Sequence, residues 1–189
     1  MGIVYYKITG IQDVIIFGVP CVGKTTTGIL LAQKLAYDFY DIDEEVITQF
    51  NTTIEKFINA FGRYERDRIR GGIIGQLLAR NGDKVISVTP MSYSRCFNKY
   101  IQRPDVIAIE LQDEPENILN RLIFTDENDQ IYEDSEEYRE AHRDYYLNDI
   151  REDIKFYSNS FKKIELKFQM NNAPPDLVVE RLIEQYFQK

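Results

Sequence analysis

The first strongly patterned part of the chain is the apolar run at residues 14–17, Val-Ile-Ile-Phe, which is followed by Gly18 and Pro20. An unbroken run of branched and aromatic residues predicts a strand buried on both faces, as in the middle of a parallel sheet. Over residues 25–37 the apolar positions instead recur at helical spacing, with small residues among them. The pattern therefore predicts a strand, a glycine-containing loop and a helix in succession.

Further strands are expected at residues 39–40, 85–89, 106–111 and 164–168, and most are separated by segments with helical patterning. This alternation predicts an α/β protein with a parallel sheet, and we expect residues 1–189 to form a single domain. Residues 1–12 could add an edge strand or a hairpin. Residues 125–136 have almost no apolar periodicity, which predicts an exposed mobile loop, either a plain surface loop or a functional lid.

Composition narrows the functional classes. Acidic residues outnumber basic ones by 31 to 23, giving a net charge of −8, so nucleic acid and anionic membranes are poor partners. Two cysteines and one histidine provide neither a disulfide framework nor a cluster of soft metal ligands. The scarcity of cysteines fits a reducing cytoplasm, and no signal-peptide layout or membrane-spanning run is visible. We expect a cytoplasmic protein that binds small molecules, as a monomer or a weak dimer.

The loop after the first strand matches the pattern G-x-x-x-x-G-K-[ST], from Gly18 to Thr25. The glycines let backbone N–H groups converge on phosphate oxygens at the start of a helix, where the helix dipole also favours anions. Lys24 is expected to reach the β- and γ-phosphates of ATP, and the hydroxyl of Thr25 to bind Mg²⁺. A plain glycine-rich turn is the alternative, but it leaves Lys24 unexplained. The expected ATP-binding residues of this segment are Gly18, Val22, Gly23, Lys24, Thr25 and Thr26.

A second constellation, Asp41 and Asp43, follows the short strand expected at residues 39–40. Strand geometry places two carboxylates with this spacing on one side, at the sheet edge where ligands of parallel α/β proteins bind. Asp41 could hold Mg²⁺ through water, and Asp43 could act catalytically by orienting an acceptor hydroxyl. The alternative is an acidic turn that caps a helix starting at Glu44.

Together these motifs resemble the shikimate kinase family of small P-loop kinases, and the resemblance covers most of residues 13–187. The family's S-I-x-x-I/F helix core and G-E-x-x-F-R segment have similar counterparts at residues 53–57 and 62–66. With a shift of one residue, the resemblance implies Arg66 as the arginine that binds the acceptor carboxylate. Arg63 and Arg68 are rivals, and all three could be ordinary exposed helix residues. A planar carboxylate suits the two-pronged guanidinium group.

The same resemblance extends to the last third of the chain. It implies Arg151 as a second acceptor-binding arginine, and Tyr157 as a packing residue. It also implies that Arg121 stacks on the adenine and that residues 171–175, including Pro174, form the adenine loop. As an alternative, Pro174 and the next proline could form a turn and the first turn of a helix.

Two departures from the family pattern concern the residues expected to bind the phosphoryl acceptor and to complete phosphoryl transfer. The family's glycine triplet after the third strand is absent, because residues 85–89 run directly into Pro90-Met91-Ser92. The R-P-L-L segment of the family lid is also absent. Arg139 or Arg143 could replace its arginine, and the alternative is that this catalytic cation is missing. Gluconate kinases, which are relatives, also carry a strand ending in Ser or Thr, but their D-G-D motif is not seen here.

The resemblance implies a three-layer P-loop NTPase fold of the nucleoside-monophosphate-kinase type, with five parallel strands in the order 2-3-1-4-5. It also implies transfer of the γ-phosphate of MgATP to a hydroxyl group of a small acidic metabolite. The alternatives are a related kinase with another acceptor, such as gluconate or a nucleotide, and a nucleotide-binding protein without catalytic activity.

Overall fold

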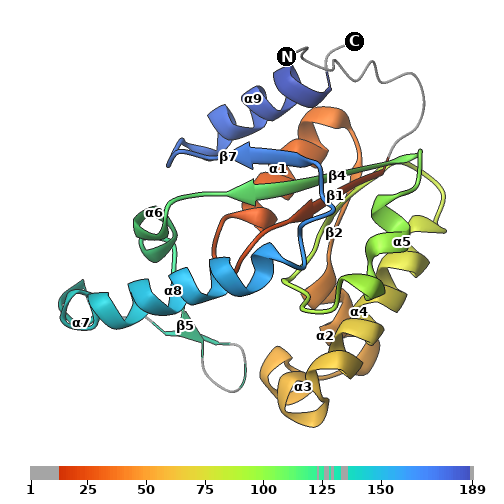
Figure 1. Cartoon of the computed structure of the whole chain (residues 1–189). Helices are drawn as coiled ribbons and strands as arrows, with labels where there is room; N and C mark the ends of the chain where they lie inside the picture. The colour runs from red at the N-terminus through yellow and green to blue at the C-terminus, as the bar shows by residue number, and fades with distance from the viewer. Residues whose placement is uncertain (1–12, 123, 126–127, 129, 133–135, 188–189) are drawn as a thin grey trace.

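The protein is built on a five-stranded parallel sheet in the order β2-β3-β1-β4-β7 (Figure 1). The computed structural model describes residues 13–122, 124–125, 128, 130–132 and 136–187. The strands are β1 (Asp13–Phe17), β2 (Asp38–Asp41), β3 (Lys84–Ser87), β4 (Val106–Gln112) and β7 (Leu166–Gln169). The expected strand order and the parallel α/β class are therefore confirmed. The expected extra strand or hairpin at residues 1–12 lies outside the described residues.

Helices connect these strands and cover both faces of the sheet. Their bounds are α1 (Lys24–Leu35), α2 (Ile42–Phe50), α3 (Ile54–Ala60), α4 (Arg63–Leu78), α5 (Asn98–Ile101), α6 (Pro115–Leu119), α7 (Glu136–Ala141), α8 (Arg143–Ser158) and α9 (Pro175–Tyr186). A short 3-10 turn, Ser94–Cys96, precedes α5. None of the helices within the described part of the chain is both long and apolar enough to cross a membrane.

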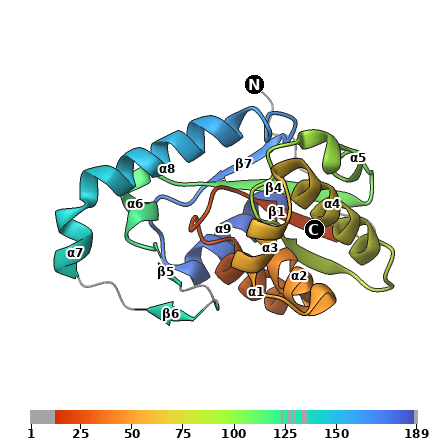
Figure 2. The same ribbon diagram turned by 90° about the horizontal axis from the view of Figure 1, so that it is seen from below.

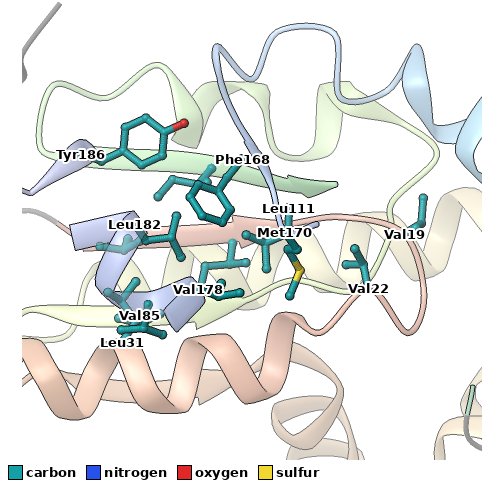
Figure 3. Packing of buried hydrophobic residues seen from close by; sticks show 14 of the residues in the cluster. Val19, Val22, Leu31, Val85, Leu111, Phe168, Met170, Val178, Leu182 and Tyr186 are labelled. Atoms are coloured by element: carbon teal, nitrogen blue, oxygen red, sulfur yellow. The ribbon is translucent and has the colours of Figure 1, made fainter. Parts of the chain in front are cut away.

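Two apolar clusters, one on each face of the sheet, give the molecule its three layers (Figures 1 and 2). In β1, Val14 and Ile16 belong to the cluster with α1 and α9, whereas Ile15 and Phe17 belong to the cluster with α2 and α4. Alternate side chains of a strand point to opposite faces, so an unbroken apolar run is what a central strand requires. Figure 3 shows the first cluster, where side chains of α1, β3 and α9 meet.

The first helix is shorter than the pattern predicts. Residues 25–37 were expected to be helical, but α1 ends at Leu35 because Ala36 adopts a left-handed backbone conformation with φ of 56°. The N–H groups of Ala36 and Tyr37 then close the helix on carbonyls of its last turn. The chain thereby turns directly into β2, which brings the residues after β2 next to the start of α1.

The segment expected to be an unpatterned loop, residues 125–136, contains secondary structure. β5 (Phe124–Thr125) and β6 (Ile131–Tyr132) pair antiparallel, and α7 begins at Glu136. Two-residue strands carry too little apolar periodicity to be recognised in a sequence. Residues 126–127, 129 and 133–135 of the expected lid lie outside the described residues.

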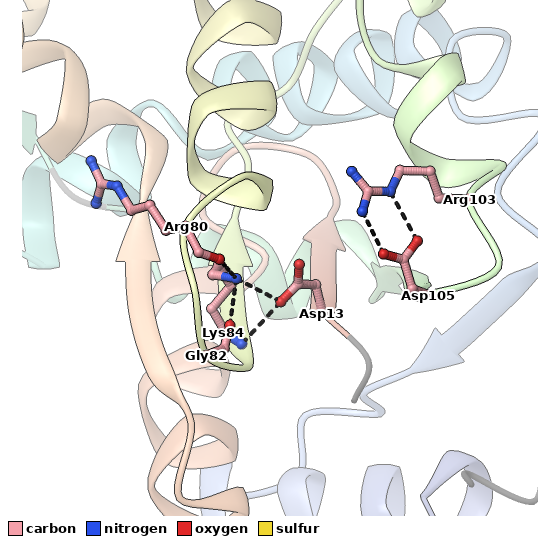
Figure 4. A network of polar contacts seen from close by, with 6 residues as sticks. All are labelled: Asp13, Arg80, Gly82, Lys84, Arg103 and Asp105. Atoms are coloured by element: carbon pink, nitrogen blue, oxygen red, sulfur yellow. Dashed lines mark hydrogen bonds and ion pairs between the residues drawn. The ribbon is translucent and has the colours of Figure 1, made fainter. Parts of the chain in front are cut away.

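A buried ion pair joins β1 and β3 at the sheet edge opposite the glycine-containing loop (Figure 4). Lys84 Nζ lies 2.9 Å from Asp13 Oδ1 and also donates hydrogen bonds to the carbonyl oxygens of Arg80 and Gly82. The Lys84 N–H group donates to the same Asp13 oxygen at 3.2 Å. The Lys84 and Asp13 side chains are 2% and 8% exposed, so water does not replace these bonds.

Replacing Lys84 with methionine should lower the free energy of unfolding by about 3–5 kcal/mol, because the Asp13 carboxylate would remain buried without its cation. Urea denaturation measures this loss. The exposed pair Arg103–Asp105, also drawn in Figure 4, provides the matched control. Replacing Arg103 with methionine should cost about 0–1 kcal/mol. Equal losses for the two variants would contradict a structural role of the buried pair.

Candidate functional site

The expected phosphate loop, from Gly18 to Thr25, joins β1 to α1 and has positive φ at both glycines of the motif. Gly18 has φ of 150°, and a Cβ atom there would lie 2.8 Å from the Leu111 carbonyl oxygen. Gly23 has φ of 108° and precedes α1 without a side-chain capping bond. The first turn of α1 also contains no acidic residue. Its N–H groups are therefore free of local side-chain acceptors, which favours an anion at this position.

Lys24 is the buried cation of this loop. Its Nζ donates a hydrogen bond to the Val19 carbonyl oxygen at 2.8 Å, and the residue is only 9% exposed. Burial disfavours the charged form and lowers the pKa of Lys24 to about 8, although the carboxylates of Asp41 and Asp43 act in the opposite direction. A phosphate group close to Nζ would supply the negative charge that this buried ammonium group requires.

Asp41 is hydrogen-bonded both to the phosphate loop and to the start of α2. The Thr25 hydroxyl donates to Asp41 Oδ2 at 2.8 Å, while Asp41 Oδ1 accepts a hydrogen bond from the Asp43 N–H group at 2.9 Å. Asp41 is thus the N-cap of α2, which begins at Ile42 rather than at the expected Glu44. The helix-capping alternative and the expected proximity to the phosphate loop are therefore both correct.

The donor set at Asp41 fits Mg²⁺. A hydroxyl and a carboxylate oxygen are hard ligands, and Mg²⁺ needs few protein ligands because it usually retains several waters. Thr25 Oγ1 and Asp41 Oδ2 lie side by side next to Lys24. No group of three or more His, Cys, Asp or Glu side chains in the described residues could hold another kind of metal ion.

Asp43 pairs with Arg70, an arginine that the sequence analysis did not select. Arg70 Nη2 lies 3.0 Å from Asp43 Oδ1, and the arginine side chain is 8% exposed. Its guanidinium carbon lies 5.4 Å from the centre of the Phe57 ring, and its Nε is buried without a hydrogen-bond partner among the described residues. Arg70 lies four residues after Arg66, on the same side of the helix, so this spacing could have marked it as a further candidate.

The three arginines considered earlier at this position have other contacts. Arg66 Nη1 is 3.5 Å from the Ile58 carbonyl oxygen, Arg63 lies over the Phe156 ring at 5.1 Å, and Arg68 lies 3.9 Å from Glu65. None of these contacts involves Asp43. The structure therefore does not bring Arg66 to Asp43, and its role in binding an acceptor stays a prediction.

The segment that replaces the family's glycine triplet is fastened to α4. The N–H group of Tyr93 donates a hydrogen bond to Asp67 Oδ2 at 2.9 Å, and Asp67 is 2% exposed. Burial raises the pKa of Asp67, although hydrogen bonds from Tyr93 and Ser92 oppose this rise. Asp67 and Arg70 thus lie one turn apart on the buried face of α4.

Arg121 lies on the other side of the phosphate loop. It lines a cavity of about 560 Å³ together with Asn120, Leu122 and the loop residues Cys21, Gly23, Lys24, Thr25 and Thr26. Its guanidinium group pairs with the buried carboxylate of Asp113. The structure thus brings Arg121 and Thr26 to one cavity, as expected for residues that contact the same nucleotide.

Pro174 and Arg151 are placed differently from Arg121. Pro174 is the N-cap of α9, and Pro175 is its first residue, so this segment starts a helix, as in the alternative interpretation.

Arg151 Nη2 lies 2.9 Å from Glu116 Oε1, so the structure does not bring Arg151 to Asp43. The two possible lid arginines lie near α7, where Arg143 pairs with Glu140 at 3.5 Å. The roles of all these residues in binding stay predictions.

Comparison with known proteins agrees with this geometry. A sequence model of the shikimate kinase family matches residues 20–186. A shikimate kinase of Geobacter sulfurreducens is 29% identical over 118 residues, which are 59% of this chain and 61% of that relative. The chain thus matches less than two thirds of that relative's length.

Solved structures share the fold. A shikimate kinase from Bacteroides thetaiotaomicron has a TM-score of 0.74 at 17% identity, over 93% of this chain and 98% of that one. A shikimate kinase from Acinetobacter baumannii has a TM-score of 0.68 at 18% identity, over 92% of each chain. The family match covers most of the chain and includes Gly23, Lys24 and Thr25 of the phosphate loop and both aspartates, so this protein belongs to the shikimate kinase family.

Proposed function

We propose that this protein is an ATP-dependent phosphotransferase that moves the γ-phosphate of MgATP to a hydroxyl group of a small acidic metabolite. The observation that carries the proposal is the convergence of three groups: buried Lys24, the Thr25–Asp41 contact and the Asp43–Arg70 pair. These groups supply a phosphate cradle, oxygen ligands for a divalent cation and a carboxylate beside a cation. Membership of the shikimate kinase family supports the same reaction.

Each residue has a distinct task in this reaction. Backbone N–H groups at Val22, Gly23 and the start of α1 hold the phosphates, and Lys24 neutralises the charge that develops on the transferred group. Thr25 and Asp41 would hold Mg²⁺, which adds positive charge at the phosphates. Asp43 orients the acceptor hydroxyl and accepts its proton as the new O–P bond forms and the bond between the γ-phosphorus and the bridging oxygen breaks.

Shikimate is the first acceptor to test. The related protein from Acinetobacter baumannii was solved in complex with shikimate. Arg70 supplies the buried positive charge next to Asp43 that an acidic acceptor requires. We propose that Arg70, rather than Arg66, is the acceptor-binding arginine of this chain, because Arg70 is the one paired with Asp43.

A second candidate is a nucleotide-binding protein without turnover. It is favoured by the contacts of Arg66 and Arg151, which lie against Ile58 and Glu116 instead of Asp43. ADP release from MgATP separates the two candidates when shikimate, gluconate, other sugar acids and nucleoside monophosphates are each compared with a blank that lacks acceptor. Nucleotide binding without acceptor-dependent release would favour the second candidate.

Asp43→Asn should lower acceptor-dependent turnover by about 10²–10⁴-fold, because the amide cannot accept the proton of the hydroxyl group. ATP affinity should remain close to that of the unmodified protein. Steady-state ADP release and calorimetric titration with MgATP measure the two effects. Lys24→Ala is the complementary variant and should lose ATP affinity. Unchanged turnover in Asp43→Asn would contradict the catalytic role of Asp43.

Arg70→Lys should lower kcat/KM for the acceptor by about tenfold or more, because an ammonium group cannot reproduce a two-pronged contact with a carboxylate. The KM for ATP should change by less than about twofold, the margin expected when an interaction outside the nucleotide site is altered. Arg66→Lys and Arg68→Lys are matched controls on the same helix. A larger loss in Arg66→Lys than in Arg70→Lys would instead assign the acceptor to Arg66.

The pKa of Lys24, about 8, predicts a pH dependence of ATP binding. At pH 7 the group is already protonated, whereas at pH 9 it is mostly neutral in the free protein. Because phosphate favours the charged form, binding at pH 9 should take up nearly one proton, and affinity should fall about tenfold per pH unit above 8. Calorimetry in buffers of different ionisation enthalpy measures the uptake. Lys24→Arg, which stays charged, should show no such uptake; equal uptake by both proteins would exclude Lys24 as its source.

A further inference from the structure

Asp113, the residue that follows β4, has a carboxylate that is 1% exposed and accepts four hydrogen bonds. Oδ1 accepts from the Glu114 N–H group at 2.9 Å and from Asn117 Nδ2 at 2.7 Å. Oδ2 accepts from Arg121 Nη2 and from the Asn172 N–H group at 3.3 Å. The two oxygens therefore serve different parts of the molecule.

The contacts of Oδ1 are local, because both donors lie within four residues of Asp113 at the start of α6. A carboxylate at the start of a helix commonly makes such bonds, and they require no ligand. The contacts of Oδ2 instead join two segments that are far apart in the sequence. One is Arg121, just beyond α6, and the other is the turn between β7 and α9.

The turn after β7 has an unusual backbone. Asn171 and Asn172 both have positive φ, at 51° and 52°, a left-handed conformation that asparagine adopts more readily than most other residues. The Asn172 N–H group points at Asp113 Oδ2. Asp113 thus helps to hold this turn through the same oxygen that binds Arg121.

The sheet order shows which part of a nucleotide Arg121 faces. Asp41 ends β2 and Asp43 lies two residues beyond it, whereas the phosphate loop follows the central strand β1. Asp113 and Asn172 follow β4 and β7 on the other side. A nucleotide with its phosphates in the loop and its transferred phosphate beside Asp43 must extend toward β4 and β7. Its nucleoside then reaches the cavity that Arg121 lines.

The guanidinium group of Arg121 depends on Asp113 for its orientation. Its Nε is buried without a hydrogen-bond partner within the described parts of the chain, whereas its Nη2 donates to Asp113. Burial by itself would raise the pKa of Asp113, but hydrogen bonds from Arg121, Asn117 and the Glu114 N–H group together lower it. The carboxylate therefore stays charged at neutral pH and can hold the cation.

We propose that Asp113 is a positioning residue for the nucleoside half of the ATP site. Its Oδ2 accepts hydrogen bonds from both Arg121 and the Asn172 N–H group, so it holds the guanidinium group of Arg121 in the wall of the cavity and anchors the turn after β7 to the same oxygen. The inference rests on the proposed function, because it requires that the phosphate loop binds ATP.

The test compares MgATP with magnesium tripolyphosphate, which contains the three phosphates without the nucleoside. In Asp113→Asn, the amide keeps one oxygen for the start of α6 and presents an NH₂ group to the donors at Arg121 and Asn172. The affinity for ATP should then fall about tenfold or more, the scale of a lost charge-assisted hydrogen bond, while tripolyphosphate affinity changes by less than about twofold. Asn117→Ala removes a partner of Oδ1 alone and is the matched control, with both affinities unchanged.

A double-mutant cycle with Arg121→Lys separates positioning from a general loss of stability. If Asp113 acts through Arg121, the effect of Asp113→Asn on ATP affinity should largely disappear in the Arg121→Lys background. Additive effects would overturn the inference. Equal losses for ATP and tripolyphosphate in Asp113→Asn would also overturn it, because the whole phosphate site would then be affected.

Failure of the proposed function gives a different result. If the unmodified protein binds neither ligand, or if Lys24→Ala binds both as well as the unmodified protein does, the phosphate-loop assignment is wrong. If the unmodified protein binds both ligands and Lys24→Ala binds neither, but Asp113→Asn retains its ATP affinity, only the positioning role of Asp113 is wrong.

Discussion

The parallel direction of all five strands is the constraint on which the candidate site depends. The residues that follow β1, β2, β3, β4 and β7 necessarily meet at one edge of the sheet, although they lie far apart in the sequence. The apolar run of β1 is buried on both faces and therefore places the phosphate loop at the centre of this edge. The two aspartates after β2 lie on one side of the loop, and Asp113 lies on the other. The opposite edge carries the Asp13–Lys84 pair, so this buried contact between two strands is separated from the site.

Much of this arrangement could be predicted from the sequence because it depends on local patterns. The run at residues 14–17 predicts a central strand, and the glycine and lysine spacing after it predicts the loop that the structure contains. The strand order came from the family resemblance rather than from the pattern, which contains no information on which strands are neighbours. The end of α1 depended on the left-handed conformation of Ala36, a conformation that alanine rarely adopts and that its sequence context does not announce.

The sequence does not show which arginine of α4 lies beside Asp43. α4 contains four arginines at residues 63–70, and the sequence gives them similar surroundings. Which one reaches Asp43 depends on how the helix is rotated, and tertiary contacts fix that rotation. Gly71 packs against the Cys96 carbonyl oxygen, where a Cβ atom would lie at 2.4 Å, so this side of α4 faces inward with Arg70 and Asp67. A contact of this kind between distant segments leaves no local sequence signal. The role of Asp113 could not be predicted for the same reason, because one hydrogen-bond donor to its Oδ2 lies 59 positions away in the sequence.

The two oxygens of the Asp41 carboxylate have different partners, and this limits what a bound cation would change at the site. One of its oxygens holds the start of α2 through the Asp43 N–H group, while the other faces Thr25. When a cation takes the second oxygen, the first can keep its bond, so the helix start stays where it is. Binding of the proposed Mg²⁺ would therefore change the electrostatic field around Asp43 while the hydrogen bond that holds the start of α2 could stay in place. In the proposed reaction, the backbone that carries Asp43 would then be in place before the nucleotide arrives.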